Sequence, residues 1–168
     1  MSTEKNTSEK IRLHPRNINR ERYDLEALKI AVPELSAHLT INKYGVESVN
    51  FANPLAVKLL NKALLNHYYD IKNWDFPDEN LCPPIPGRAD YLHYMADLLS
   101  QSNFGELPSG ETIKVLDVGV GASSIYPIIG VSAYGWDFIG TDIEPKSIEA
   151  AKNIVSSNSI LEGKIEIR

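Results

Sequence analysis

KVLDVGVGASSIYPIIG, residues 114–130, followed by TDIE at 141–144, is the stretch that decides the fold of this chain. A short apolar run ends in Asp117, glycines follow at positions 119 and 121, and a helical pattern then begins. A second apolar run ends in the aspartate of TDIE. This order of strand, glycine turn, helix and strand with a carboxylate at its tip predicts a cleft of the nucleotide-binding type.

The residues around the glycine turn discriminate between possible cofactors. A dinucleotide fingerprint requires a third glycine three positions after the second, and this chain has Ser124 there. Asp117, just before the turn, would repel a pyrophosphate but suits a ligand with a cationic amino-acid part. S-adenosylmethionine has such a part, and its ribose hydroxyls would donate to Asp142 at the tip of the next strand. The residues therefore favour S-adenosylmethionine over NAD, and a Rossmann-like turn that binds no cofactor is the remaining alternative.

The composition is that of a soluble globular chain of one domain's size. Hydrophobic residues make up 43% of the 168 positions and charged residues 23%, and the net charge of −5 argues against a global basic field for nucleic acid. A single cysteine, Cys82, cannot form an intramolecular disulfide and fits the reducing cytosol, so we expect a cytoplasmic protein. No segment resembles a signal peptide or a membrane span, and the scattered histidines predict no metal site.

The N-terminal residues 1–22 are predicted to form a basic arm on this acidic protein. Residues 1–10 are polar, and we expect them to be disordered. Residues 10–22 contain five cations and a single acid, Glu21. The cations are Lys10, Arg12, Arg16, Arg20 and Arg22. From charge alone the arm is either a solvated tail or a segment that contacts the phosphates of RNA.

Residues 23–110 are predicted to form a mainly helical region with a short hairpin. Three helices are expected at 25–32, 54–69 and 88–100, and two strands at 39–41 and 46–51. Asp24 and Asn53 stand where the first two helices need a cap. Residues 70–87 contain four prolines and predict an extended segment, and 101–111 predict a linker.

The remainder, residues 111–168, is predicted to be the first part of a parallel sheet. Strands are expected at 112–118, 136–141 and 164–167, and helices at 123–134 and 145–157. A doubly wound sheet grows from its first strand in both directions, and only one side is present here. The other edge of Ile113–Val118 therefore lacks a partner, and we expect the chain to be an N-terminal fragment of a longer enzyme.

Longer motifs give this chain a resemblance to a known family. They are GASSIYP after the acidic strand, PPIPGRADYLHYMADLL before it, and LHPRN, RYD and NKYG…VNFANPLAV further upstream. With them the chain resembles, from about Leu13 to its end, the bacterial adenine-N6 methyltransferases of 23S rRNA. Their eukaryotic relatives methylate U6 small nuclear RNA and mRNA hairpins. The resemblance implies a class I methyltransferase fold (α/β, Rossmann-like), S-adenosylmethionine as the cofactor and 23S rRNA as the partner.

The resemblance also implies roles for individual residues. Gly119, Gly121 and Ser123 match the family's glycine turn around the methionine part of the cofactor. Asp142 matches its acidic ribose ligand. Arg88 matches an arginine that reaches the cofactor, where a guanidinium can hold a carboxylate with two hydrogen bonds. The cofactor-binding set expected from the residues and the resemblance together is Arg88, Asp117, Gly119, Gly121, Ser123 and Asp142.

The family's catalytic motif, Asn-Pro-Pro-Phe, is missing from this sequence. Asn53-Pro54 is no substitute, because a leucine follows it and it lies outside the sheet. We therefore expect no catalytic residue here and a chain that is inactive alone. In the complete enzyme the protein would position adenine N6 for direct attack on the methyl carbon. The resemblance favours RNA binding by the basic arm, and the alternative functions are a non-catalytic RNA- or nucleotide-binding module and an NAD-dependent oxidoreductase.

Overall fold

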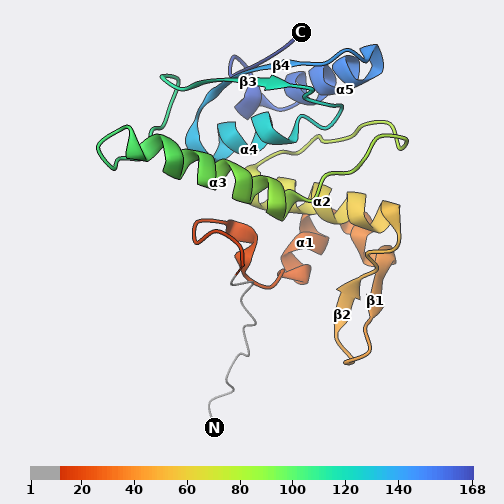
Figure 1. Ribbon diagram of the computed structural model, residues 1–168. Coiled ribbons are helices and arrows are strands. Elements are labelled where there is room, and N and C mark those ends of the chain that lie inside the picture. The colour runs from red at the N-terminus through yellow and green to blue at the C-terminus, as the bar shows by residue number, and fades with distance from the viewer. Residues whose placement is uncertain (1–11) are drawn as a thin grey trace.

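The structure, a computed structural model, describes residues 12–168. The predicted disorder of residues 1–10, with Lys10, lies outside this range. Figure 1 shows a layered molecule, with a parallel sheet at one end, helices beneath it and a two-stranded hairpin that projects at the other end. Within residues 12–168, no helix combines the length and the apolar character that crossing a membrane requires.

The first two helices begin at the caps that the sequence predicts. The Asp24 carboxylate accepts a hydrogen bond from a backbone N–H of the first turn of α1 (Leu25–Ala31). The Asn53 side chain accepts two such bonds in the first turn of α2 (Pro54–Tyr69). These bonds satisfy N–H groups that have no partner inside the helix. Asn53 therefore serves as a helix cap.

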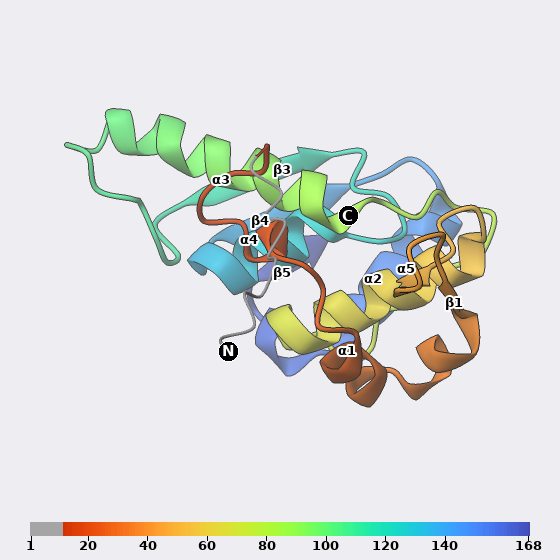
Figure 2. The same cartoon turned by 90° about the horizontal axis from the view of Figure 1, so that it is seen from below.

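The hairpin consists of β1 (Leu39–Ile41) and β2 (Glu47–Val49), which pair antiparallel. Gly45 in the connecting turn has a φ of +73°, a conformation that side chains with a Cβ rarely adopt. Both strands lie where the sequence predicts them, although the second is shorter. Figure 2, seen from below, shows this hairpin beside α2, away from the parallel sheet.

The third helix, α3 (Ile85–Gln101), begins three residues earlier than the start predicted at Arg88. The sequence prediction of an extended segment was therefore wrong for residues 85–87. Pro86 is compatible with the first turn, because the N–H groups there have no intrahelical partner to lose. Residues 70–84 contain no helix or strand, as expected for a proline-containing segment, but Asp70 is left-handed and residues 78–80 form a turn. Three short 3-10 helices were not predicted and are η1 (Ile18–Arg20), η2 (Pro33–His38) and η3 (Ser159–Leu161).

The C-terminal part confirms the predicted βαβαβ unit. Three parallel strands stand in the order β3-β4-β5, and two helices connect them: β3 (Lys114–Val118), α4 (Ile125–Tyr134), β4 (Asp137–Thr141), α5 (Pro145–Ser156) and β5 (Ile165–Ile167). Gly130 of α4 packs directly against the Phe138 ring of β4, so a larger residue there would clash. Among the described residues β3 pairs with β4 alone, which leaves one edge of the sheet open.

Side chains alternate along β3, so its two faces differ in exposure. Val115 and Asp117 are half-buried, whereas Leu116 and Val118 are 63% and 78% exposed. The face that carries Leu116 and Val118 is therefore uncovered in the described chain.

Residues 14–20, the N-terminal clasp, pack against α3 and α4. His14, Asn17 and Asn19 are buried, and His14 Nε2 lies 2.9 Å from Asp97 Oδ2 on α3. Asn17 donates its side-chain N–H to the carbonyl of Pro86 at 2.8 Å. From His14 onward the predicted arm is thus part of the folded structure.

Candidate functional site

The candidate site lies at the turn between β3 and α4, where the strand ends of the sheet meet. Gly119 and Gly121 have φ angles of +78° and +68°. An added Cβ would meet nothing within 4 Å at either position. Glycine is therefore required by the left-handed backbone conformation, and the space beside the turn is open to a ligand.

Ser124 stands where a dinucleotide fingerprint has its third glycine. It has a φ of +47° and begins α4 without forming a side-chain cap. Its side chain is fully buried, and its Oγ has no hydrogen-bond partner. A left-handed residue with a Cβ costs on the order of 1–3 kcal/mol, and such strain clusters at ligand sites.

Asp142 connects the tip of β4 to the glycine turn. Its Oδ2 accepts a hydrogen bond from the backbone N–H of Gly121 at 2.9 Å. Its Oδ1 accepts from the backbone N–H groups of Ile143 at 2.8 Å and Glu144 at 3.0 Å. The bond from Glu144, with those from Gly121 and Ile143, holds the pKa of Asp142 below its ordinary value. The structure thus brings Gly121 and Asp142 into direct contact. The Asp142 carboxylate is ionised at neutral pH.

Asp117 is the second acid at this edge of the sheet, and it has an unused oxygen. Its Oδ2 is buried and has no hydrogen-bond partner. Burial, and then the nearby charge of Asp142, raise the pKa of Asp117 above its ordinary value. A buried carboxylate oxygen without a partner is unfavourable, so a cationic ligand group beside it would relieve that cost.

Asp117 lines a cavity of about 360 Å³ together with residues of α3 and α4, including Tyr91 and Tyr126. Arg88, in the first turn of α3, donates from Nη1 to the Tyr126 hydroxyl at 2.7 Å and lies 5.3 Å from the centre of its ring. The Arg88 Nε is buried without a partner. Tyr126 therefore connects Arg88 to the cavity that holds Asp117.

Ser123 is hydrogen-bonded to Trp74, a residue that the sequence did not indicate as part of the site. The Trp74 indole N–H donates to the Ser123 carbonyl at 2.9 Å, and both side chains are buried. A buried tryptophan usually has a hydrogen-bond partner for its indole N–H. A tryptophan in the proline-rich segment is therefore a signal that this segment bonds to another part of the chain. The identity of that partner, 49 positions away, has no local signature.

The cations of the predicted arm lie in different environments. Arg16 donates to Asp97 at 2.6 Å, to the His93 carbonyl at 3.0 Å and to the Tyr134 hydroxyl at 3.2 Å. Arg12 and Arg22 are exposed, and Arg20 is half-buried in η1. RNA binding by these residues stays a prediction, with Arg16 engaged within the fold.

Over residues 12–168 no three or more histidine, cysteine, aspartate or glutamate side chains form a group that could hold a metal ion.

Comparison with known proteins places these features in a family. A family model described as RNA methyltransferase matches residues 7–168. The chain is 54% identical over 167 residues to ribosomal RNA large subunit methyltransferase F of Marinomonas sp. (strain MWYL1), covering 99% of this chain and 51% of that protein. It is 58% identical over 153 residues to the protein of the same name from Flavobacterium johnsoniae, covering 91% and 48%. The chain thus spans about half the length of the curated relatives it matches.

Solved structures show the same fold. The N-terminal domain of human METTL16 in complex with SAH matches with a TM-score of 0.80 and 31% identity, over 93% of this chain and 58% of that one. The human METTL16 catalytic domain in complex with the MAT2A 3′UTR hairpin 6 matches with a TM-score of 0.78 and 31% identity, over 93% and 52%. The predicted class I methyltransferase fold is confirmed by these matches.

Proposed function

This chain belongs to the RNA methyltransferase family, and from that membership we propose that it is the cofactor-binding part of an enzyme that methylates adenine N6 in 23S rRNA. The proposed methyl donor is S-adenosylmethionine, and the proposed location is the cytoplasm. Support comes from the relatives named ribosomal RNA large subunit methyltransferase F. The human neighbours solved with SAH and with an RNA hairpin support the cofactor and the type of partner.

The observation that carries the proposal is the pair of acids on either side of the glycine turn. Asp117 offers a buried oxygen without a partner, which suits the cationic amino group of the donor. Asp142 already accepts three backbone bonds, and a carboxylate accepts about four, so one position remains for a ribose hydroxyl. The same Asp117 would repel the pyrophosphate of NAD, which disfavours the oxidoreductase alternative.

The remaining site residues have roles that fit the same ligand. Gly119 and Gly121 allow the backbone to approach the methionine part, and Ser123 belongs to the same turn. Arg88 has a buried Nε without a partner, which suits a carboxylate. S-adenosylmethionine supplies an electrophilic methyl group when bound. The residues of this chain would hold that group in place and shield it from water.

Positioning of the adenine is assigned to the Asn-Pro-Pro-Phe motif, which this sequence lacks. Positioning alone can contribute about 7–11 kcal/mol of barrier lowering. We therefore propose that the 168-residue chain binds the cofactor but transfers no detectable methyl group by itself.

The test has two parts. Calorimetry on the chain should show binding of S-adenosylmethionine and no binding of NAD. A radiolabelled methyl-transfer assay on 23S rRNA should show transfer by the Marinomonas relative as the positive control and none by this chain. Binding of NAD in preference to S-adenosylmethionine would overturn the cofactor. Transfer by the chain at the relative's rate would overturn the assignment of catalysis to the missing motif.

A further inference from the structure

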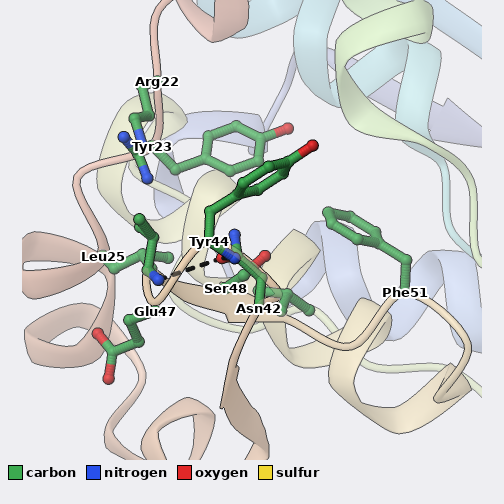
Figure 3. A pocket seen from close by; sticks show the side chains of 10 residues that line it. Arg22, Tyr23, Leu25, Asn42, Tyr44, Glu47, Ser48 and Phe51 are labelled. Atoms are coloured by element: carbon green, nitrogen blue, oxygen red, sulfur yellow. Dashed lines mark hydrogen bonds between the residues drawn. The ribbon is translucent and has the colours of Figure 1, made fainter. Parts of the chain in front are cut away.

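A second pocket lies far from the glycine turn, between the hairpin and the segment that leads into α1. It has a volume of about 510 Å³, within the range of ligand sites. We call it the hairpin pocket, and Figure 3 shows the side chains that line it. Tyr23, Tyr44 and Phe51 supply three aromatic rings to it from three separate parts of the chain. Neither of the two acids of the glycine turn lines it.

Two of these rings are exposed, and each belongs to a hydrogen-bonded turn. Tyr44 is 76% and Phe51 is 64% exposed. The Asn42 side chain accepts from the backbone N–H groups of Tyr44 at 2.9 Å and Val46 at 3.1 Å. These bonds stabilise the turn that presents Tyr44, so its backbone loses little freedom when a ligand binds there.

Phe51 is presented in the same way by the turn that precedes α2. The Asn50 side chain accepts from the backbone N–H of Ala52 at 3.1 Å, and the Asn50 carbonyl accepts from the N–H of Asn53 at 3.0 Å. In Figure 3 Phe51 enters the pocket from the side opposite Tyr23. The pocket thus offers aromatic rings on fixed turns, on which a flat ligand can stack.

The charge at the pocket favours an anionic ligand. Arg22 lines the pocket and is exposed, and Lys43 lies at the hairpin tip with its Nζ 5.0 Å from the centre of the Tyr44 ring. Glu47, the acid in the lining, is paired with Lys29 at 3.1 Å. Two cations beside aromatic rings are the combination that binds a nucleic acid strand, with bases stacked and phosphates neutralised.

We propose that the hairpin pocket binds an unpaired nucleobase of the RNA, stacked on Tyr44 and Phe51, with the adjoining phosphates on Arg22 and Lys43. This inference rests on the proposed function and adds an RNA contact to it. Figure 1 places the hairpin at the end of the molecule opposite the sheet, so the base held there is distinct from the adenine that is methylated. The pocket serves as an anchor that selects RNA with single-stranded nucleotides at a distance from the target.

The experiment measures binding of the chain to a labelled RNA stem-loop and to a blunt duplex of the same stem. Tyr44→Ala should weaken binding of the stem-loop about 5- to 150-fold, the effect of removing one stacking ring, and leave the duplex unchanged. Tyr44→Phe should retain the affinity, because it keeps the ring. Phe104→Ala is the matched control, because Phe104 is fully exposed and lies outside the pocket.

Salt dependence separates stacking from charge. Tyr44→Ala should leave the slope of log K against log salt unchanged, whereas Arg22→Gln should flatten it by about one unit. Both Tyr44 and Phe51 are mostly exposed, so their alanine variants should melt like the wild type and remain interpretable.

The outcomes distinguish the pocket from the proposed function. If the wild type binds the stem-loop and both Tyr44→Ala and Phe51→Ala bind it with the same affinity, the pocket is not an RNA site. That outcome would leave the methyltransferase proposal intact. Binding of S-adenosylmethionine without any RNA binding would overturn the pocket and the RNA contribution of this chain. If the alanine variants bind RNA like the wild type but show less self-association by light scattering, the pocket is a contact between copies of the chain. That outcome would overturn the inference.

Discussion

The indole N–H of Trp74 donates a hydrogen bond to the backbone carbonyl of Ser123 at 2.9 Å. Trp74 is 1% exposed and belongs to the segment 70–84, which connects α2 to α3. This bond attaches that segment to the turn proposed to hold the cofactor. The position of the turn therefore depends on a residue 49 positions away in the sequence.

Replacing Trp74 by phenylalanine should weaken both the fold and cofactor binding. The Ser123 carbonyl would lose its buried donor, which costs about 1–3 kcal/mol of unfolding free energy. Trp136→Phe is the matched control, because the buried Trp136 indole donates to the Pro108 carbonyl, also at 2.9 Å. Thermal unfolding should show a loss for both variants, and calorimetry should show weaker S-adenosylmethionine binding for Trp74→Phe alone. Equal cofactor affinities would refute the link between Trp74 and the site.

Asp117→Asn should stabilise the free chain at neutral pH while weakening cofactor binding. Burial raises the pKa of Asp117, so the ionised carboxylate destabilises the folded state, and asparagine removes that charge. Loss of a charged partner for the cofactor's amino group should weaken binding by about 1.5–3 kcal/mol. Melting curves and titrations of the two proteins measure both effects.

The pH dependence of Asp117→Asn has a definite sign. The penalty in the wild type exists above the raised pKa of Asp117, where the folded carboxylate must ionise. The penalty disappears as the pH falls below the pKa that Asp117 has in the unfolded chain, since the carboxyl is then neutral in both states. The difference in melting temperature should therefore shrink on acidification, and a difference that grows would contradict the assignment.

Asp142→Ala should lower cofactor affinity by about 1.5–3 kcal/mol, the scale of a hydrogen bond to a charged group. Three backbone N–H groups would also lose their acceptor, so the melting temperature should fall. The pKa of Asp142 is lowered, so its stabilisation is present at neutral pH and is lost as the pH falls through that lowered value. Glu162→Gln, an exposed acid outside the site, is the control. Unchanged affinity for S-adenosylmethionine would exclude Asp142 as the ribose ligand.

The arginines of the basic arm should separate into two classes. Arg12 and Arg22 are exposed, so replacing both by alanine should flatten the salt dependence of RNA binding by about two units. Arg16 is bonded to Asp97, His93 and Tyr134, so Arg16→Ala should lower the melting temperature and alter the slope less. Cofactor affinity should stay constant in every case. An identical slope in the wild type and the Arg12/Arg22 variant would make the arm a solvated surface.

The chain should self-associate through the open edge of β3. That edge has unpaired backbone groups among the described residues, and Leu116 beside it is 63% exposed. Leu116→Lys should reduce the association, because a charge at a sheet edge opposes pairing with another chain. Ile30→Lys is the control, since Ile30 is 82% exposed but lies on a helix. Light scattering over a range of concentrations measures the result, and equal association of the two variants would refute the role of the edge.

The sequence predicted those elements whose signals are local. Local signals include the caps at Asp24 and Asn53, the glycine turn, and the order of strands and helices from residue 111 onward. Each depends on neighbours within a few positions, and each predicted a helix or strand where the structure has one. The start of α3 was misplaced because two prolines and a glycine read as a breaker, although a helix tolerates proline in its first turn.

The remaining features depend on contacts between distant residues. Asp117 and Asp142 were identified as candidates, but the unpaired oxygen of the first and the bond from Gly121 to the second follow from packing. Burial of His14 depends on Asp97, 83 positions away, and no pattern around His14 indicates it. The hairpin pocket likewise combines three segments, so the sequence predicted the turn but not the cavity.

The N-terminal clasp has a consequence for the order of folding. His14 and Arg16 bond to residues 83 and 118 positions away, on α3 and α4, so their partners exist only after those helices have packed. Closing such long loops costs entropy that few local contacts repay early. The clasp therefore closes late in folding and opens first in local unfolding, and the backbone amides of residues 14–20 should exchange with solvent before those of the sheet.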